Sequence, residues 1–123
     1  MILIGDTFLI PTPPDYKKEH LFIIIAANKA NGEWLMVNIA TLKDNCDNSC
    51  IIKKGSHPFI KRDSYVKYSE AIITDTQTIK ILLHKKQISP HAAISQALLR
   101  KILMGARITN AISKKHLDFI SRT

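Results

Sequence analysis

A seven-residue apolar run, Leu21–Ala27, constrains the fold of this chain more than any other segment. It is far shorter than the ~18 apolar residues that a transmembrane helix needs, and unbroken hydrophobicity over this length is typical of a strand buried on both faces. The dipeptide Asn31-Gly32 follows and favours a tight hairpin turn. Glu33–Thr41 then forms the return strand, so we predict a β-hairpin whose first strand is covered on both sides.

The segments around this hairpin are also predominantly of β type. Isoleucine, which is stiff at χ1 and suits strands, occurs 20 times in 123 residues. Three prolines within Pro11–Pro14 end the first short strand and exclude both a helix and a central strand there. The further predicted β segments are Thr7–Ile10, Cys50–Ile52, Ser64–Tyr68, Ala71–Thr74 and Thr78–Leu83.

The hydrophobic period changes to a helical one after residue 88. Ser89-Pro90 has the pattern of an N-cap followed by a first-turn proline, and Gly105 is typical of a helix end. A second helix is predicted over about Asn110–Ile120. Five to seven short strands followed by two helices indicate a single α+β domain or small barrel, with the strands over about 4–88 and the helices over about 89–123.

The positive charge is concentrated in the second half of the chain. The net charge is +8, yet residues 1–75 hold nine cations and nine carboxylates, whereas residues 76–123 hold nine cations and only Asp118. Such an excess is either a solvated basic face or a contact for a polyanion, whether nucleic acid or an acidic protein. The residues expected to make that contact are Arg100, Lys101, Lys114 and Lys115.

Cys46 and Cys50 are the only cysteines. A zinc site needs about four ligands, and only His57 lies near enough in sequence to be a third. We therefore expect two ordinary thiols and no bound metal or cofactor. The N-terminus lacks the basic region of an export signal, which favours a cytoplasmic protein without a membrane segment.

Candidate functional residues lie in two loops and at one strand end, since no specific catalytic motif is present. The first loop contains Tyr16, Lys17, Lys18 and His20, a combination suited to contact phosphate and bases, with His20 able to transfer a proton near neutral pH. Each feature also has a plain structural interpretation, as a polar loop or a turn. The other candidates are Thr41, which could bind a phosphate oxygen, and His57 and Arg62 in the second loop.

The order of these segments resembles the MazF/Kid/PemK toxins of toxin–antitoxin systems. Gly5-Asp6-Thr7-Phe8-Leu9 is similar to the opening of that family, and the apolar strand from His20 and the strand ending in Thr41 are similar to its second and third strands. The resemblance runs over roughly residues 5–104. It implies an SH3-like barrel, a homodimer, an acidic antitoxin partner, and cleavage of RNA by its own 2′-OH without a metal.

The family's catalytic threonine corresponds to Thr41, but the arginine expected before the second strand is absent. We infer from the residues present that His20 would transfer the proton and that Lys17, Lys18 or Arg62 would supply the cation. The departure leaves two alternatives open. The chain is then a non-catalytic module or inactive relative that binds nucleic acid or protein, or a subunit that docks on an acidic protein.

Overall fold

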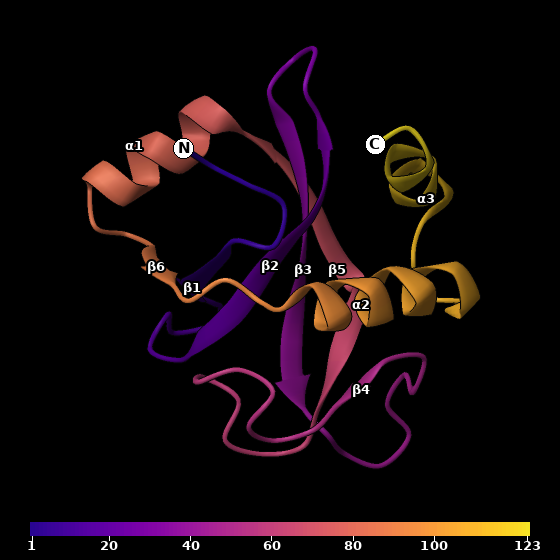
Figure 1. Ribbon diagram of the computed structural model, residues 1–123. Coiled ribbons are helices and arrows are strands. Elements are labelled where there is room, and N and C mark those ends of the chain that lie inside the picture. The colour runs from indigo at the N-terminus through magenta and orange to yellow at the C-terminus, as the bar shows by residue number, and fades with distance from the viewer.

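A single antiparallel sheet of six strands organises the chain, in the order β4-β5-β3-β2-β1-β6. The computed structural model describes all residues from Met1 to Thr123. The sheet is strongly curled, and its longest strands cross the middle of the molecule (Figure 1). The strands are β1 (Thr7–Pro11), β2 (Glu19–Asn28), β3 (Glu33–Thr41), β4 (Ile51–Ile52), β5 (Ser64–Asp75) and β6 (Ser89–His91).

The predicted hairpin is confirmed. Every residue of Leu21–Ala27 is buried, and β2 pairs with β1 on one side and with β3 on the other. Gly32 has a φ of 72°, which an L side chain rarely adopts, so glycine is required at that turn position. Strand β5 joins two segments that the sequence suggested separately, Ser64–Tyr68 and Ala71–Thr74.

Successive side chains of β2 and β3 enter two different hydrophobic cores because they alternate between the faces of the sheet. Leu21 and Ile23 belong to the larger core, and Phe22 and Ile24 to the smaller one. Helices α2 (Gln96–Ile108) and α3 (Lys114–Ser121) contribute buried residues to the larger core, whereas α1 (Thr76–His84) contributes to the smaller one. Figure 1 shows α1 well apart from α2 and α3.

The strand predicted over Thr78–Leu83 is wrong, because this segment is helical. Asp75 caps α1 by accepting a hydrogen bond from the backbone N–H of Thr78 at 2.7 Å. Ile79 is buried in the smaller core, with Leu82 and Leu83 packed beside it. Residues i, i+3 and i+4 on one helical face thus explain an apolar run that also fitted a strand.

The helix start predicted at Ser89-Pro90 is also wrong. Ser89, Pro90 and His91 form the edge strand β6, where a proline is tolerated because one side of the strand needs no partner. The cap is Ser95, whose hydroxyl accepts a hydrogen bond from the N–H of Leu98 at 3.1 Å. Helix α2 continues past Gly105, so this glycine does not end it.

The second late helix is confirmed as α3, which begins at Lys114 after its cap Ser113. Six strands lie within the predicted five to seven, and three helices replace the predicted two. The molecule is therefore an α+β protein with a curled half-barrel sheet. None of its helices combines the length and hydrophobicity that would be needed to cross a membrane.

Candidate functional site

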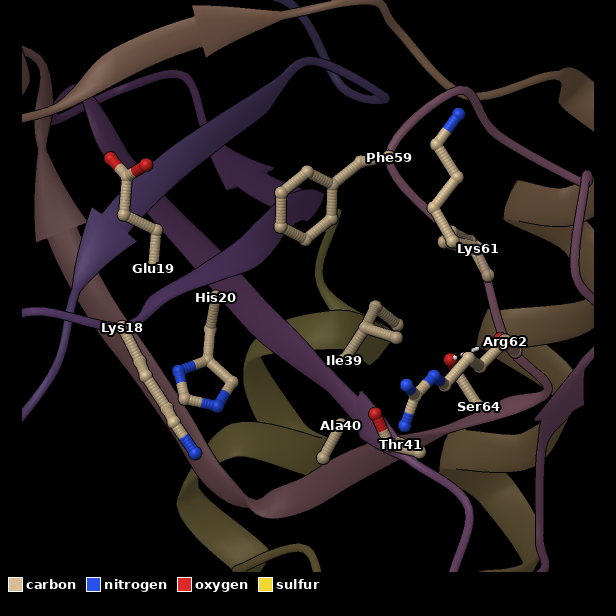
Figure 2. A pocket seen from close by; sticks show the side chains of 11 residues that line it. Lys18, Glu19, His20, Ile39, Ala40, Thr41, Phe59, Lys61, Arg62 and Ser64 are labelled. Atoms are coloured by element: carbon tan, nitrogen blue, oxygen red, sulfur yellow. Dashed lines mark hydrogen bonds between the residues drawn. The ribbon is translucent and has the colours of Figure 1, made fainter.

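A groove of about 380 Å³ lies at one end of the sheet, where three neighbouring strands begin or end. Because the strands are antiparallel, the start of β2 lies beside the end of β3, which lies beside the start of β5. Thr41 pairs directly with Ser64 in this register. The loop before β5 forms the remaining wall. The groove residues are Lys18, Glu19, His20, Ile39, Ala40, Thr41, Phe59, Ile60, Lys61, Arg62 and Ser64 (Figure 2).

The groove carries more positive than negative charge. Lys18, Lys61 and Arg62 are exposed, and the only carboxylate among the lining residues is that of Glu19. The two ion pairs of the molecule, Lys53–Asp63 and Lys67–Glu70, involve none of these residues. The three groove cations are therefore free to contact an anion.

Thr41 and Arg62 lie next to each other on one wall of the groove. Thr41 is exposed at the end of β3, and Figure 2 shows the guanidinium of Arg62 directed toward its hydroxyl. The hydroxyl of Ser64 donates to the carbonyl oxygen of Arg62 at 2.8 Å, which fixes the backbone that carries the guanidinium. A hydroxyl beside a guanidinium can bind two oxygens of one phosphate.

His20 lies at the same end of the sheet, but its ring projects from the opposite face to Thr41. Residues of β2 alternate, so His20 shares a face with Phe22 of the smaller core, whereas Thr41 shares a face with Ile39 of the larger core. Figure 2 shows the His20 ring beside Lys18 and directed away from Thr41. The structure thus places His20 and Thr41 at one end of the sheet without bringing the imidazole and the hydroxyl together.

The His20 ring has a defined orientation. Its Nδ1 lies 2.8 Å from the hydroxyl of Thr12, in the loop that the prolines form after β1. Its Nε2 has no hydrogen-bond partner within the chain, which leaves this atom available to a ligand. A neighbouring hydroxyl that holds one ring nitrogen selects the orientation in which the other nitrogen acts.

A polar cluster adjoins His20 on its own face of the sheet. The amide of Asn38 donates to Glu70 at 2.8 Å, and Lys67 lies 2.9 Å from the other oxygen of that carboxylate. Hydrogen bonding and charge lower the pKa of Glu70, chiefly through Lys67, with smaller contributions from Asn38 and His20. The same carboxylate raises the pKa of Lys67. Sequence reasoning missed this cluster, although an asparagine within the apolar run Met36–Ile39 was a signal for it.

His57 does not line the groove. It is buried, with Nε2 at 2.6 Å from the carbonyl oxygen of Ala92, and its Nδ1 accepts a hydrogen bond from the N–H of Phe59 at 3.0 Å. Burial lowers its pKa, and the neighbouring His91 adds to this effect. His57, expected to contact RNA, instead fastens the loop that carries Phe59 and Arg62 to the segment after β6.

The remaining sequence candidates lie outside the groove. Tyr16 and Lys17 are exposed in the proline loop, next to Lys18. Arg100, Lys101, Lys114 and Lys115 are exposed on α2 and α3, where the ammonium of Lys101 donates to the carbonyl oxygen of Ile51.

The two cysteines are both free thiols. Cys50 is buried in the larger core, where burial raises its pKa. Cys46 lies in the loop before β4. Nowhere do three or more His, Cys, Asp or Glu side chains gather closely enough to hold a metal ion.

Comparison with protein-family models, curated proteins and solved structures found no match for this chain. The residues of the groove are therefore the basis for assigning a function, and the resemblance to the MazF/Kid/PemK toxins remains a prediction.

Proposed function

We propose that this protein binds single-stranded RNA in the groove at the end of the sheet. The observation that carries the proposal is the set of three unpaired cations, Lys18, Lys61 and Arg62, around the half-buried ring of Phe59. Cations neutralise phosphates, and an aromatic ring provides a surface on which an unpaired base stacks. A duplex hides its base faces, so this combination favours a single strand.

Salt dependence tests this proposal. Binding of a fluorescent RNA oligomer, measured by anisotropy across a salt series, should weaken steeply as salt rises, because neutralised phosphates release counterions. Arg62→Ala should weaken binding and reduce the log–log salt slope by about 0.7 for the one lost phosphate contact. Arg107→Ala, at an exposed position on α2, removes the same charge outside the groove and should leave the slope unchanged. Equal losses in both variants would move the binding site away from the groove.

RNA cleavage is the second candidate, and the facing side chains of Thr41 and Arg62 favour it. In this reaction the 2′-OH loses its proton and its oxygen bonds to the adjacent phosphorus. The P–O5′ bond breaks and the 5′ oxygen takes up a proton, which leaves a 2′,3′-cyclic phosphate. Arg62 and Thr41 would stabilise the charge on the phosphate oxygens, as oriented donors do, and Lys18 would add a further cation. The free Nε2 of His20 lies on the opposite face of the sheet from Thr41, so His20 would transfer the proton only where the bound strand passes around the strand ends between them.

A cleavage assay in the presence of a chelator separates the two candidates. The catalytic proposal predicts 2′,3′-cyclic phosphate products with the unaltered protein and a loss of about 100-fold or more in His20→Ala, the range typical of a general acid or base. Thr41→Ala should also slow the reaction. Binding without turnover would retain the RNA-binding proposal and exclude the catalytic one.

The resemblance also implies an acidic antitoxin-like protein partner and a homodimer on an SH3-like barrel. Exposed Arg100, Lys101, Lys114 and Lys115 suit an acidic protein, because they add positive charge on two neighbouring helices. Light scattering of the purified chain tests the dimer. Mixing with an acidic peptide, with and without Arg100→Ala and Lys114→Ala, tests the charge contact.

A further inference from the structure

Glu19 is an unusual residue for a groove that binds a polyanion. It is the only carboxylate among the lining residues, and Figure 2 shows it across the groove from Arg62, with the ring of Phe59 between Glu19 and Lys61. It nevertheless forms no ion pair and no side-chain hydrogen bond. An exposed carboxylate repels the phosphates of a bound strand, so its place in the groove requires a compensating contact.

Glu19 and Phe59 line the same groove on the same face of the sheet. Glu19 is the first residue of β2 and shares the face of Leu21 in the larger core, and Phe59 packs against that same core. Figure 2 shows the Glu19 carboxylate and the Phe59 ring on the same side of β2 and β3. The ring of Phe59 also meets the ring of His91 edge-on, with centroids 6.1 Å apart and planes at 74°, which fixes its orientation.

A base stacked on Phe59 would present its edge to an acceptor-only group. Among the four RNA bases, guanine alone has two adjacent donors, N1–H and the 2-amino group, on its Watson–Crick edge. A carboxylate accepts both in a bidentate arrangement. Uracil and cytosine place acceptors beside their single donor, and these acceptors are repelled.

We infer that Glu19 makes the groove selective for guanine, with Phe59 as the stacking surface. This inference rests on the proposed RNA binding. The cations Lys61 and Arg62 then hold the phosphates, and the one carboxylate reads the base, which explains why both charges occur in one groove.

The test uses four RNA heptamers that differ only at the central base: guanine, inosine, adenine or uracil within flanking uracils. Anisotropy at one fixed salt concentration gives the four affinities for the full chain. The guanine oligomer should bind about tenfold more tightly than the uracil oligomer, as expected for one bidentate base contact. Inosine lacks the 2-amino group and should fall between them.

Glu19→Gln should remove this preference, because the glutamine amide presents a donor as well as an acceptor. It should also bind all four oligomers at least as tightly as before, since a negative charge is lost. Asp118→Asn makes the same charge change on exposed α3 and should keep the preference for guanine. Equal affinities for all four oligomers, inosine binding as tightly as guanine, or a preference that survives Glu19→Gln would each overturn the inference. A chain that binds none of the oligomers would instead contradict the proposed function.

Discussion

Helix α2 packs so closely against the sheet at Gly105 that no side chain fits there. A Cβ added at Gly105 would lie 2.8 Å from the Cβ of Cys50 and 3.0 Å from the carbonyl oxygen of Ser49, and closer still to the hydroxyl of Tyr68. That hydroxyl donates to the carbonyl oxygen of Ile102 at 2.6 Å. Glycine therefore allows α2 to approach β5 and the end of the loop before β4 closely, at the cost of helix propensity.

Gly105→Ala should destabilise the protein by about 1–3 kcal/mol, the usual range for overpacking a tight site. The sign is informative, because glycine to alanine within an unconstrained helix stabilises by roughly 0.5–1 kcal/mol. Urea denaturation measures the change. The same substitution in a Tyr68→Phe background should cost less, since one of the clashing atoms is gone. An unchanged or raised stability in Gly105→Ala would contradict the close approach.

His57 should make stability depend on pH. Burial holds its pKa below the ordinary value of 6.5, so the unfolded chain takes up the proton first as the pH falls. The contribution of neutral His57 to the free energy of unfolding is complete above about pH 6.5. It decreases as the pH falls from there toward the lowered pKa that His57 has in the folded state. Denaturation midpoints between pH 7.5 and 5 should therefore fall less in His57→Gln than in the parent chain. His84, at an exposed position on α1, is the matched control, and His84→Gln should keep the pH dependence of the parent chain. An unaltered pH profile in His57→Gln would contradict this assignment.

At the scale of elements, short polar side chains determine where the helices begin. Asp75, Ser95 and Ser113 each accept a hydrogen bond from a backbone N–H of the first turn. The sequence analysis assigned the cap of the first late helix to Ser89, whereas in the structure Ser95 caps α2. Ser89 has a following proline but lies in β6, paired with Leu9.

Ser95→Ala should cost about 1 kcal/mol, the usual loss for an N-cap serine. Ser89→Ala should stay within about 0.5 kcal/mol, because its side chain is exposed and makes no hydrogen bond. Thermal or urea denaturation of the two variants measures this difference directly. A larger loss in Ser89→Ala than in Ser95→Ala would restore the helix start that the sequence suggested.

At the scale of the whole molecule, the late helices are part of the core rather than a separate tail. Ile120 of α3 is buried in the larger core, and Phe119 packs against it. The cations of the last 48 residues lie in or directly after α1, α2 and α3, and α1 lies on the other side of the sheet from α2 and α3 (Figure 1). The groove cations Lys18, Lys61 and Arg62 belong to the neutral first part of the chain.

Ile120→Ala should therefore destabilise the entire fold by about 2–5 kcal/mol, as expected for a buried large-to-small substitution. Ile108→Ala, at the end of α2, is the matched control, because Ile108 is 70% exposed. Its effect should stay within about 0.5 kcal/mol. A single cooperative transition with a lower midpoint for Ile120→Ala confirms one folding unit. An early separate transition would instead indicate that α3 detaches by itself.

The sequence by itself determined the elements whose signals are local. The apolar run Leu21–Ala27 and the turn at Gly32 specify the hairpin, because burial on both faces and a positive φ each leave a mark on neighbouring residues. It also drew attention to Lys18, Thr41 and Arg62, which meet in one groove.

Only the tertiary structure decided the rest. The period of Thr78–Leu83 fitted a strand or a helix until the smaller core supplied a partner for Ile79. The separation of His20 from Thr41 depends on which strand residues face each core, and the burial of His57 depends on Ala92, 35 residues away along the chain. Such contacts join distant segments, and no local pattern of residue types records them.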